Sequence, residues 1–253
     1  MPPDSGVMRT AVKRFALVSA VLALILGAAL LIPSTRARLW SVFTRIRGRQ
    51  TVESVLADVG SAARTRLATS GAAPFTPGSK LTLVALKQEK MLYVFTAVDA
   101  QPPTLIKSYP ILAASGGPGP KTTQGDNQVP EGLYRVESLN PNSAFHLALR
   151  LDYPNAEDRR IAKEEGRDPA TLGGDIMIHG TDISFGCLAM GNDAAEDLFV
   201  LAALVGAERV RILISPTDFR SGPLPAEVPG GPEWLQALYA RLQQELAQFP
   251  AAP

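Results

Sequence analysis

An uncharged stretch of eighteen residues, 15–32, constrains the architecture of this chain more than any other feature. It consists mostly of Leu, Ala, Val and Ile, and it is preceded by Arg9, Lys13 and Arg14. A helix of this length is near the lower limit for crossing a bilayer. The stretch is longer than the usual apolar core of a cleaved signal peptide, and no small-x-small cleavage pattern follows it. Because it is apolar all round and has basic flanks, we expect a transmembrane signal anchor at 15–32 after a cytoplasmic segment, 1–14.

The remaining residues predict a β-rich domain with flanking helices. Apolar residues recur at helical spacing within 50–68, which indicates an amphipathic juxtamembrane helix, and the Gly/Ala/Pro-rich residues 70–78 indicate a linker. Strands are expected at 81–86, 91–98, 105–112, 132–137, 145–151 and 175–179, and helices at 156–165, 193–205 and 232–249. Several short strands with few helices predict a β-sandwich or a mixed α+β domain.

The length of 253 residues, 46% of them hydrophobic, is enough to bury a substantial core once the apolar run is set aside. We divide this part of the chain into a juxtamembrane helix and linker at 33–79, a main domain at 80–215, and a linker with a C-terminal helix at 216–253. The last helix carries an apolar stripe of Leu235, Leu238, Leu242 and Leu246. Such a stripe favours packing against the core over binding to a separate partner.

The sole cysteine of the chain, Cys187, lies eight residues after His179, which is one of only two histidines. A thiol is a far better nucleophile once deprotonated, and a nearby imidazole can take its proton. The residues therefore allow a mechanism in which His179 withdraws the thiol proton and Cys187 attacks an amide carbonyl to form an acyl-enzyme. The alternative is an unreactive cysteine that fills a gap in the core.

Neighbouring residues are candidates for supporting roles. Backbone N–H groups near Gly186 and Cys187 are candidate oxyanion donors, because glycine permits close approach of a substrate. Ser184 either orients the imidazole or shapes this site, or it is a turn serine that bonds its own backbone. Asp175 and Asp182 flank the histidine, and each could orient it or be a solvated loop carboxylate, so neither is assigned a role.

The run 178–187 resembles the active-site signature of the L,D-transpeptidase family, also called the YkuD domain, in which His-Gly is followed by Ser-x-Gly-Cys. Residues 121–134 resemble the family segment K-x-x-x-G-D-x-x-T-P-E-G-x-Y, with Val129 in place of the threonine. Residues 139–147 and 153–155 resemble segments of the branch typified by the YafK proteins of Gram-negative bacteria.

Two positions depart from the wider family. Many members read Ser/Thr-His/Arg-Gly-Cys-x-Arg, whereas here Phe185 precedes the glycine and Ala189 replaces the arginine. Both departures, and the short spacing from His179 to Cys187, are similar to the YafK-type branch. They bear on substrate details more than on the nucleophile.

The resemblance implies a YkuD-like β-sandwich, with Cys187 as nucleophile and His179 as base in acyl transfer on peptidoglycan stem peptides, in cell wall remodelling. An amine acceptor would give transpeptidation and water would give hydrolysis, after the same first half-reaction. Some members of the branch are hydrolases that release a wall-linked lipoprotein, so a peptidoglycan hydrolase or amidase is the nearest alternative. A non-catalytic wall-binding module with an inert Cys187 is another. No diffusible cofactor is implied.

Two arguments bear on the orientation of the anchor, and they point in opposite directions. Basic residues after the apolar run outnumber those before it, and the positive-inside tendency alone would leave the main domain in the cytoplasm. The substrate implied by the resemblance lies outside the inner membrane, and long domains translocate largely regardless of charge. We therefore expect an inner-membrane anchor with the catalytic domain in the periplasm of a Gram-negative bacterium.

Four further side chains have two interpretations each. Alternation along the strand at 145–151 puts His146 and Arg150 on a polar face, which either helps to bind a stem-peptide carboxylate or is solvated. Tyr134 and Tyr153 are candidate substrate walls by resemblance, and packing residues otherwise.

Other classes of function are disfavoured. The Gly-rich run 115–122 has Pro120 where a phosphate-binding loop needs glycine, and proline lacks an N–H. One cysteine and two histidines without a ligand-spacing pair predict no metal site. A formal net charge of +1, without a basic stripe interleaved with aromatic residues, makes nucleic acid an unexpected partner.

Overall fold

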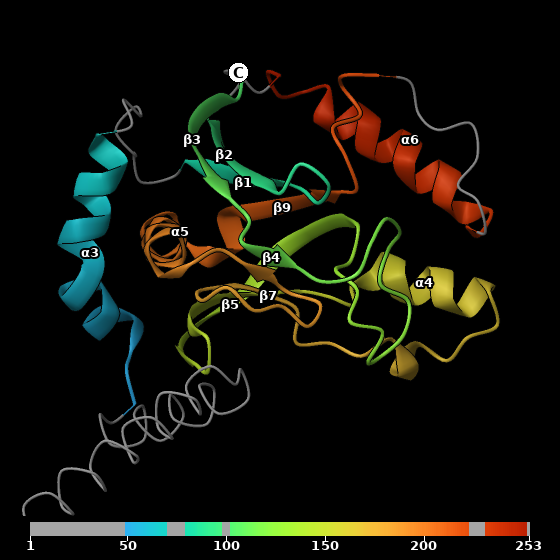
Figure 1. Ribbon diagram of the computed structural model, residues 1–253, viewed down its shortest axis with the longest axis horizontal. Helices are drawn as coiled ribbons and strands as arrows, with labels where there is room; N and C mark the ends of the chain where they lie inside the picture. The colour runs from blue at the N-terminus through green and yellow to red at the C-terminus, as the bar shows by residue number, and fades with distance from the viewer. Residues whose placement is uncertain (1–48, 70–78, 98–101, 223–230, 252–253) are drawn as a thin grey trace, which may run out of the picture. The chain divides into compact units, whose positions relative to one another are not determined.

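The computed structural model describes residues 49–69, 79–97, 102–222 and 231–251 (Figure 1). The apolar run at 15–32 and the expected linker at 70–78 lie outside these residues. In the described part of the chain, no helix has both the length and the apolar character needed to cross a membrane. The chain divides into a unit of residues 1–49 and a compact unit of residues 50–253, and every described helix and strand belongs to the second.

A nine-stranded sheet organises the described residues, in the order β3-β2-β1-β9-β5-β6-β7-β8-β4. Its strands are β1 (Lys80–Leu86), β2 (Met91–Ala97), β3 (Thr104–Pro110), β4 (Ala113–Ala114), β5 (Gly132–Ser143), β6 (His146–Leu151), β7 (Met177–His179), β8 (Leu188–Ala189) and β9 (Val210–Ser215). β5 is shared between two halves of the sheet, because its first residues pair with β9 and its later residues pair with β6. The pairs β1–β9 and β7–β8 are parallel, and the others are antiparallel.

Four α-helices and two 3-10 helices accompany the described strands. They are α3 (Val52–Ala68), α4 (Ala156–Glu164), η1 (Pro169–Leu172), α5 (Asn192–Val205), η2 (Ala207–Arg209) and α6 (Trp234–Leu246). α3 begins with a capping box, in which the Thr51 side chain accepts from the Ser54 N–H and the Ser54 side chain accepts from the Thr51 N–H. The β-rich α+β fold expected from the sequence is confirmed, and the helices lie within about two or three residues of their predicted bounds.

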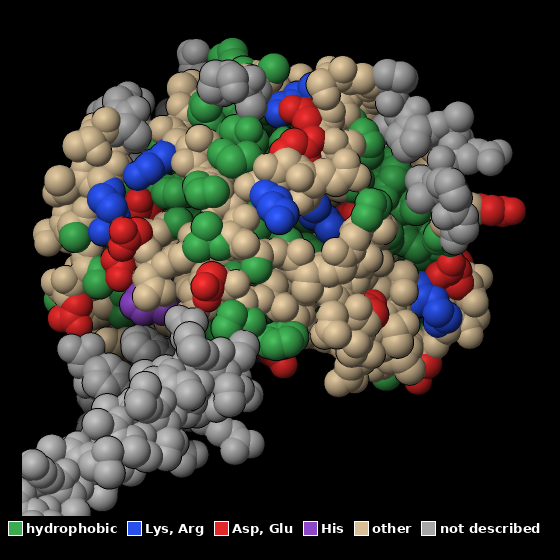
Figure 2. Space-filling view, in the orientation of Figure 1, with side chains coloured by type: hydrophobic (Ala, Val, Ile, Leu, Met, Phe, Trp, Pro, Cys, Tyr) green, Lys and Arg blue, Asp and Glu red, His purple; other side chains and the backbone are tan. Residues whose placement is uncertain are grey.

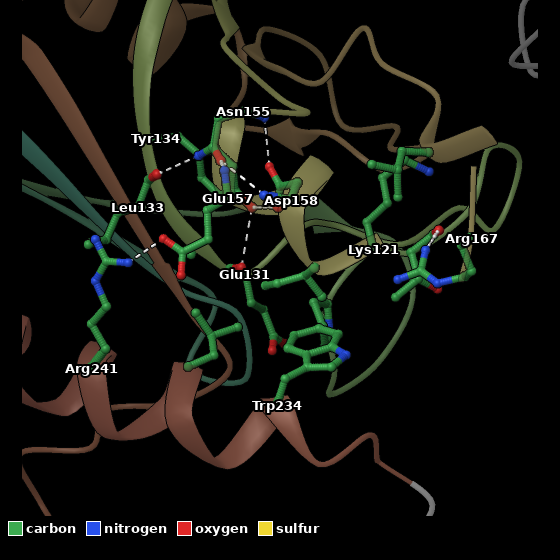
Figure 3. A pocket seen from close by; sticks show the side chains of 16 residues that line it. Lys121, Glu131, Leu133, Tyr134, Asn155, Glu157, Asp158, Arg167, Trp234 and Arg241 are labelled. Atoms are coloured by element: carbon green, nitrogen blue, oxygen red, sulfur yellow. Dashed lines mark hydrogen bonds and ion pairs between the residues drawn. The ribbon is translucent and has the colours of Figure 1, made fainter. Parts of the chain in front are cut away.

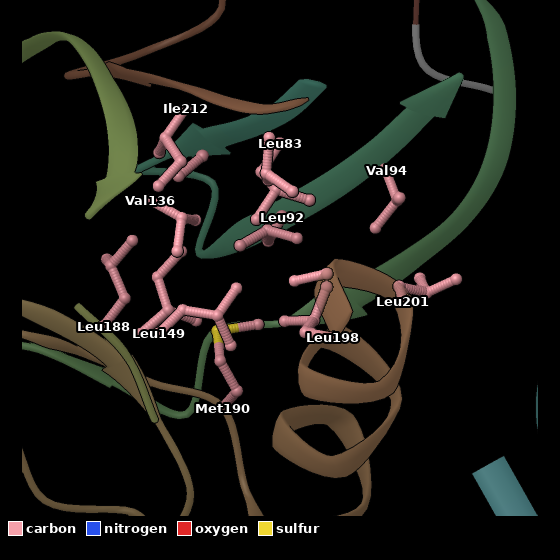
Figure 4. Packing of buried hydrophobic residues seen from close by; sticks show 14 of the residues in the cluster. Leu83, Leu92, Val94, Val136, Leu149, Leu188, Met190, Leu198, Leu201 and Ile212 are labelled. Carbon is pink, nitrogen blue, oxygen red and sulfur yellow. The ribbon is translucent and has the colours of Figure 1, made fainter. Parts of the chain in front are cut away.

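The apolar residues of the sheet fill two clusters on its opposite faces. Leu81, Leu83 and Ala85 of β1 contribute to the larger cluster, with residues of α3, α5 and the β6–β8 half. Figure 4 shows this cluster, where Leu198 and Leu201 of α5 lie among side chains from both halves of the sheet. Val84 and Leu86 contribute to the smaller cluster, which α6 covers with its apolar stripe. The C-terminal helix therefore packs against the core, as its stripe predicts.

Candidate active site

The parallel pairing of β7 with β8 brings together the two segments that carry the predicted catalytic residues. β7 ends at His179, and β8 begins directly after Cys187. In the parallel pair Ile178 lies opposite Leu188, so the cysteine enters beside the start of β7. Its Sγ lies 3.6 Å from the carbonyl oxygen of Asp175. The thiol is thus placed against the backbone that leads into β7.

The imidazole of His179 is buried, with 1% of its residue surface exposed. Its Nδ1 lies 2.6 Å from the carbonyl oxygen of Gly180. Because a carbonyl only accepts, Nδ1 carries the hydrogen of the neutral ring and Nε2 keeps a free lone pair. Phe145 stacks on the ring at a centroid distance of 4.8 Å and an interplanar angle of 27°. Burial lowers the pKa of His179, while the bond to Gly180 acts in the opposite direction. The ring is therefore held as a neutral base.

The Cys187 side chain is half-buried. Burial raises its pKa above the ordinary range for a thiol. A hydrogen bond from the Met177 backbone opposes that shift, and the carboxylate of Asp175 adds to it. The hydrogen bonds described for the two side chains run from the thiol to Asp175 and from Nδ1 to Gly180. Burial thus favours the neutral form of both the Cys187 thiol and the His179 imidazole.

Ser184 has the turn role predicted as one of its two interpretations. Its hydroxyl donates to the Cys187 carbonyl at 2.6 Å, and it accepts from the backbone N–H of Ser115 at 3.1 Å. The two serine hydroxyls are 3.0 Å apart, and because Ser184 already donates to Cys187, Ser115 is the donor between them. Ser184 therefore shapes the turn that carries Cys187.

Gly186 has a positive φ of 103°, a conformation that glycine adopts without strain. An added Cβ there would lie 3.1 Å from the backbone oxygen of Gln128. Its backbone N–H donates to the Ser115 hydroxyl at 2.6 Å. This N–H is thus already engaged, and Gly186 would have to release Ser115 before it could serve as an oxyanion donor.

The second histidine of the chain, His146, contacts an acidic side chain of α5. Nε2 of His146 lies 3.0 Å from Oε1 of Glu196 on α5. The side chain of Asp175 pairs with Arg150, so it is a surface carboxylate and does not orient His179. Phe145, the residue before His146, stacks on the imidazole of His179. Phe145 and Ser115 are thus the site residues that sequence reasoning missed.

A comparison with protein families decides the identity of this domain. The model of the L,D-transpeptidase catalytic domain, YkuD, matches residues 80–212. The chain belongs to the L,D-transpeptidase family. The resemblance read from the sequence is therefore confirmed.

Individual relatives agree with this assignment. The chain is 38% identical over 144 residues to "Putative L,D-transpeptidase YafK" of Escherichia coli K12, and to the protein of the same name in Escherichia coli O157:H7. These matches cover 55% of this chain, which spans about half (55%) of the length of the curated relatives it matches.

Solved structures are more distant. The helical cell shape determining protein Pgp2 of Campylobacter jejuni is 20% identical with a TM-score of 0.45, over 65% of this chain and 57% of that chain. Bd1075 of Bdellovibrio bacteriovorus is 22% identical with a TM-score of 0.41, over 67% and 55%. L,D-transpeptidase 1 of Mycobacterium tuberculosis is 16% identical with a TM-score of 0.32, over 54% and 62%. No property of the site is inferred from these three structures.

The family segment at 121–134 stabilises the L,D-transpeptidase domain from within. Nζ of Lys121 lies 2.7 Å from Oδ1 of Asp126. Glu131 is 2% exposed and pairs with the buried Lys87 at 2.9 Å. Tyr134 is buried in the larger core cluster and donates to Asp158. The segment thus fixes the loop whose Gln128 carbonyl lies against Gly186.

Tyr134 and Tyr153 are packing residues, the second of the two interpretations given above. They are 3% and 4% exposed, and their rings meet edge-on at a centroid distance of 6.0 Å. Burial raises the pKa of both phenols. Both rings are therefore part of the packed interior, and Tyr134 also borders the pocket described next.

A separate pocket lies between the start of β5, α4 and α6 (Figure 3). It is lined by, among others, Tyr134, Asp158, Trp234 and Arg241, and not by Cys187 or His179. Burial raises the pKa of Asp158 to about 6. The Arg241 guanidinium in this pocket pairs with Glu157. Among the described residues, no group of three or more His, Cys, Asp and Glu residues is placed to hold a metal ion.

Proposed function

We propose that this L,D-transpeptidase domain transfers acyl groups of peptidoglycan stem peptides through a thioester on Cys187, with His179 as the general base. The observation that carries this proposal is the state of the His179 ring. Its bond to Gly180 holds the hydrogen on Nδ1 and leaves Nε2 free to accept a proton. The only thiol of the chain, that of Cys187, directly precedes β8, the strand that pairs with β7.

In the first half-reaction, the thiol leaves the Asp175 carbonyl and gives its proton to Nε2 of His179, and the sulfur attacks the amide carbonyl carbon. The carbon–nitrogen bond then breaks, and the imidazolium returns the proton to the leaving amine. The product is a thioester on Cys187. Because both groups are neutral at rest, the proton moves as substrate engages and does not create a standing ion pair.

In the second half-reaction, an acceptor attacks the thioester carbonyl and His179 takes the proton of that acceptor. The thiolate leaves and is protonated again. An amine acceptor gives a cross-link, whereas water gives hydrolysis, including release of a wall-linked lipoprotein. Transpeptidation is the proposed outcome because the YafK relatives carry that name. No diffusible cofactor enters either step.

The location that suits this substrate is the periplasm. Peptidoglycan lies outside the inner membrane, and residues 15–32 have the length and apolar composition of a signal anchor. We therefore propose a chain anchored in the inner membrane, with the catalytic domain on the periplasmic side. Fusion of a periplasm-specific reporter to the C-terminus tests this orientation, and an active cytoplasmic reporter would contradict it.

Mass spectrometry of the full-length chain incubated with muropeptides tests the chemistry. We expect an acyl adduct on Cys187 in the wild type and none in Cys187→Ala. His179→Ala keeps the thiol, and its acylation should slow by about 10²- to 10⁴-fold, the usual contribution of a general base. Glu164→Gln is the matched control, since it removes an exposed carboxylate on α4 that pairs only with Arg160 among the described salt bridges.

The products separate the remaining alternatives. Cross-linked muropeptides support transpeptidation, whereas shortened or lipoprotein-free products make the chain a hydrolase that uses the same acyl-enzyme. A correctly folded chain with neither adduct nor turnover on these substrates would contradict the enzymatic proposal and favour a wall-binding module.

A further inference from the structure

The helix α3 is joined to the rest of the compact unit at both of its ends. Before its first turn, the backbone N–H of Gln50 donates to the Asn142 side chain at 2.9 Å, and the Asn142 amide donates back to the Gln50 carbonyl at 2.8 Å. Near its last turn, Arg66 bonds to two neighbouring carboxylates of α5, Glu196 and Asp197. One end of α3 therefore holds the tip of the β5–β6 hairpin, and the other end holds α5.

Asp197 makes the contact with α5 firm. It is 1% exposed, and it accepts from Arg66 at 2.7 Å, from Lys107 at 3.2 Å and from the Tyr109 hydroxyl at 3.0 Å. A buried carboxylate whose partners come from two other elements is costly to disrupt. Figure 2 shows acidic and basic side chains gathered over α3 and α5, where a histidine also reaches the surface. These bonds therefore fix the position of α3 against α5.

Glu196 connects the contact between α3 and α5 to the β5–β6 turn. One of its oxygens lies 3.0 Å from the Arg66 guanidinium, and the other lies 3.0 Å from Nε2 of His146. His146 has a φ of 68°, in the left-handed region that residues other than glycine adopt only where surrounding contacts compensate. The bond to Glu196 is one such contact. The conformation of the turn therefore depends on a carboxylate that α3 holds in place.

The same turn lies directly on the proposed base. The Phe145 ring covers the His179 imidazole, and the Leu147 carbonyl accepts from the Gly180 N–H at 3.2 Å. The turn also approaches Gly180 so closely that an added Cβ would lie 2.8 Å from Cβ of His146 and 3.0 Å from the Phe145 oxygen. A shift of the turn would therefore move the ring of Phe145 relative to that of His179.

We propose that Glu196 and His146 are positioning residues. They link the contact between α3 and α5 to the β5–β6 turn, and so hold Phe145 against the His179 imidazole. This inference rests on the proposed function of His179 as the base. It assigns to the helix that follows residues 1–49 a role in the geometry of the active site.

The test uses three single variants of the full-length chain. Each variant breaks one of the contacts between α5, the β5–β6 turn and the His179 ring. His146→Asn keeps a residue type that tolerates the left-handed conformation, but its side chain is too short to reach Glu196. Glu196→Gln removes the charge that Arg66 and His146 share, and Phe145→Leu removes the stacked ring while keeping an apolar side chain. Glu164→Gln is again the control, since it breaks an exposed pair on α4.

The first readout is an NMR titration of the histidine rings, which does not depend on turnover. In His146→Asn the signal of His179 is the only one, because the chain has two histidines. Loss of the cover over the imidazole should raise its pKa toward the ordinary range, relative to the wild type. We expect this rise in all three variants and no change in Glu164→Gln.

The second readout is steady-state kinetics on muropeptides. Misplacement of the base should lower kcat about tenfold or more and leave KM within about twofold, because the contacts with substrate are intact. Variants that keep the wild-type pKa of His179 and the wild-type kcat per folded molecule would overturn the proposal and leave these contacts a structural role only. If one variant does not fold, the other two decide.

The proposed function fails by a different result. If the wild type forms no adduct on Cys187, or if His179→Ala acylates at the wild-type rate, then His179 is not the base. The ring titration still shows in that case whether α3, Glu196 and His146 control the environment of His179.

Discussion

The hydroxyl of Ser115 accepts a 2.6 Å hydrogen bond from the backbone N–H of Gly186, and this bond ties the segment after β4 to the turn that carries Cys187. Gly186 is buried, so its N–H would lack this partner if the hydroxyl were removed. The same hydroxyl is bonded to Ser184. One side chain thus supports two consecutive parts of the turn.

We predict that Ser115→Ala lowers both kcat and the free energy of unfolding. A buried donor without an acceptor costs about 1–3 kcal/mol. Denaturant unfolding and muropeptide turnover measure the two effects. Ser221→Ala is the control, because Ser221 is an exposed turn serine that bonds only the nearby Asp218 carbonyl. A kcat above the wild-type value would contradict this prediction, and it would indicate that the released Gly186 N–H stabilises the oxyanion.

Hydrophobic periodicity predicts most of the fold, because α3, α5, α6 and the longer strands each show a pattern with a clear period. β9 was missed. It reads Val-Arg-Ile-Leu-Ile-Ser, and both of its faces are covered, so it lacks the alternation of a half-exposed strand. β4 and β8 were also missed, since two residues are too few to show a period.

The site was predictable only where its residues lie close in sequence. Cys187 and His179 stand out because they are scarce and near each other. Phe145 and Ser115 reach the site through the pairing of β6 with β7 and of β4 with β8. Such long-range pairing has no local signal, and so the residues that hold the imidazole and the turn appear only in the folded structure.

Glycine 180 provides a sharp test of how closely the hairpin packs. In Gly180→Ala the new Cβ would lie 2.7 Å from Oδ1 of Asn192 and 2.8 Å from Cβ of His146. We expect a loss of about 1–3 kcal/mol of unfolding free energy, the usual cost of overpacking, together with a lower kcat.

Gly60→Ala is the matched control for Gly180→Ala. Gly60 lies inside α3, and an added Cβ would meet nothing within 4 Å. Alanine is the better helix former, so this variant should gain roughly 0.5–1 kcal/mol. Equal stabilities of the two variants by denaturant unfolding would contradict the close packing at Gly180.

The pH dependence of stability should reveal Asp158. Its pKa is raised to about 6 by burial, above the value of about 3.9 in an unfolded chain. Between these values the folded state keeps the proton that the unfolded state releases, so the wild type loses stability as pH rises from about 4 to about 6. Asp158→Asn lacks this loss.

We therefore expect the stability of Asp158→Asn relative to the wild type to improve with rising pH. The change should be on the order of 2 kcal/mol between pH 4 and pH 7, after allowance for partial exposure of the carboxyl. Denaturant unfolding at a series of pH values measures it. A difference between the two proteins that is constant with pH would contradict a raised pKa, whatever its absolute size.

The protonation state of Cys187 at rest is also testable by its pH dependence. Because burial raises the pKa of Cys187, the thiolate fraction near neutral pH is small. We expect the rate of alkylation by iodoacetamide to increase through the alkaline range, with a midpoint above that of an unperturbed cysteine peptide measured alongside. Rapid alkylation that is already constant between pH 6 and pH 7 would indicate a standing thiolate–imidazolium pair, and the neutral resting pair would be wrong.

Phe185 is the most exposed large hydrophobic residue among those described, with 65% of its surface accessible, and it lies two positions before Cys187. Its exposure suits contact with a substrate at Cys187. We expect Phe185→Ala to raise KM for muropeptides about tenfold, since loss of roughly 1–2 kcal/mol of apolar contact corresponds to that change. Its unfolding free energy should stay within about 0.5 kcal/mol of the wild type, because the side chain packs little in the free protein. Leu204→Ala on α5, a second partly exposed apolar residue, is the control. A KM that Phe185→Ala leaves unchanged would mean that the ring does not contact the substrate.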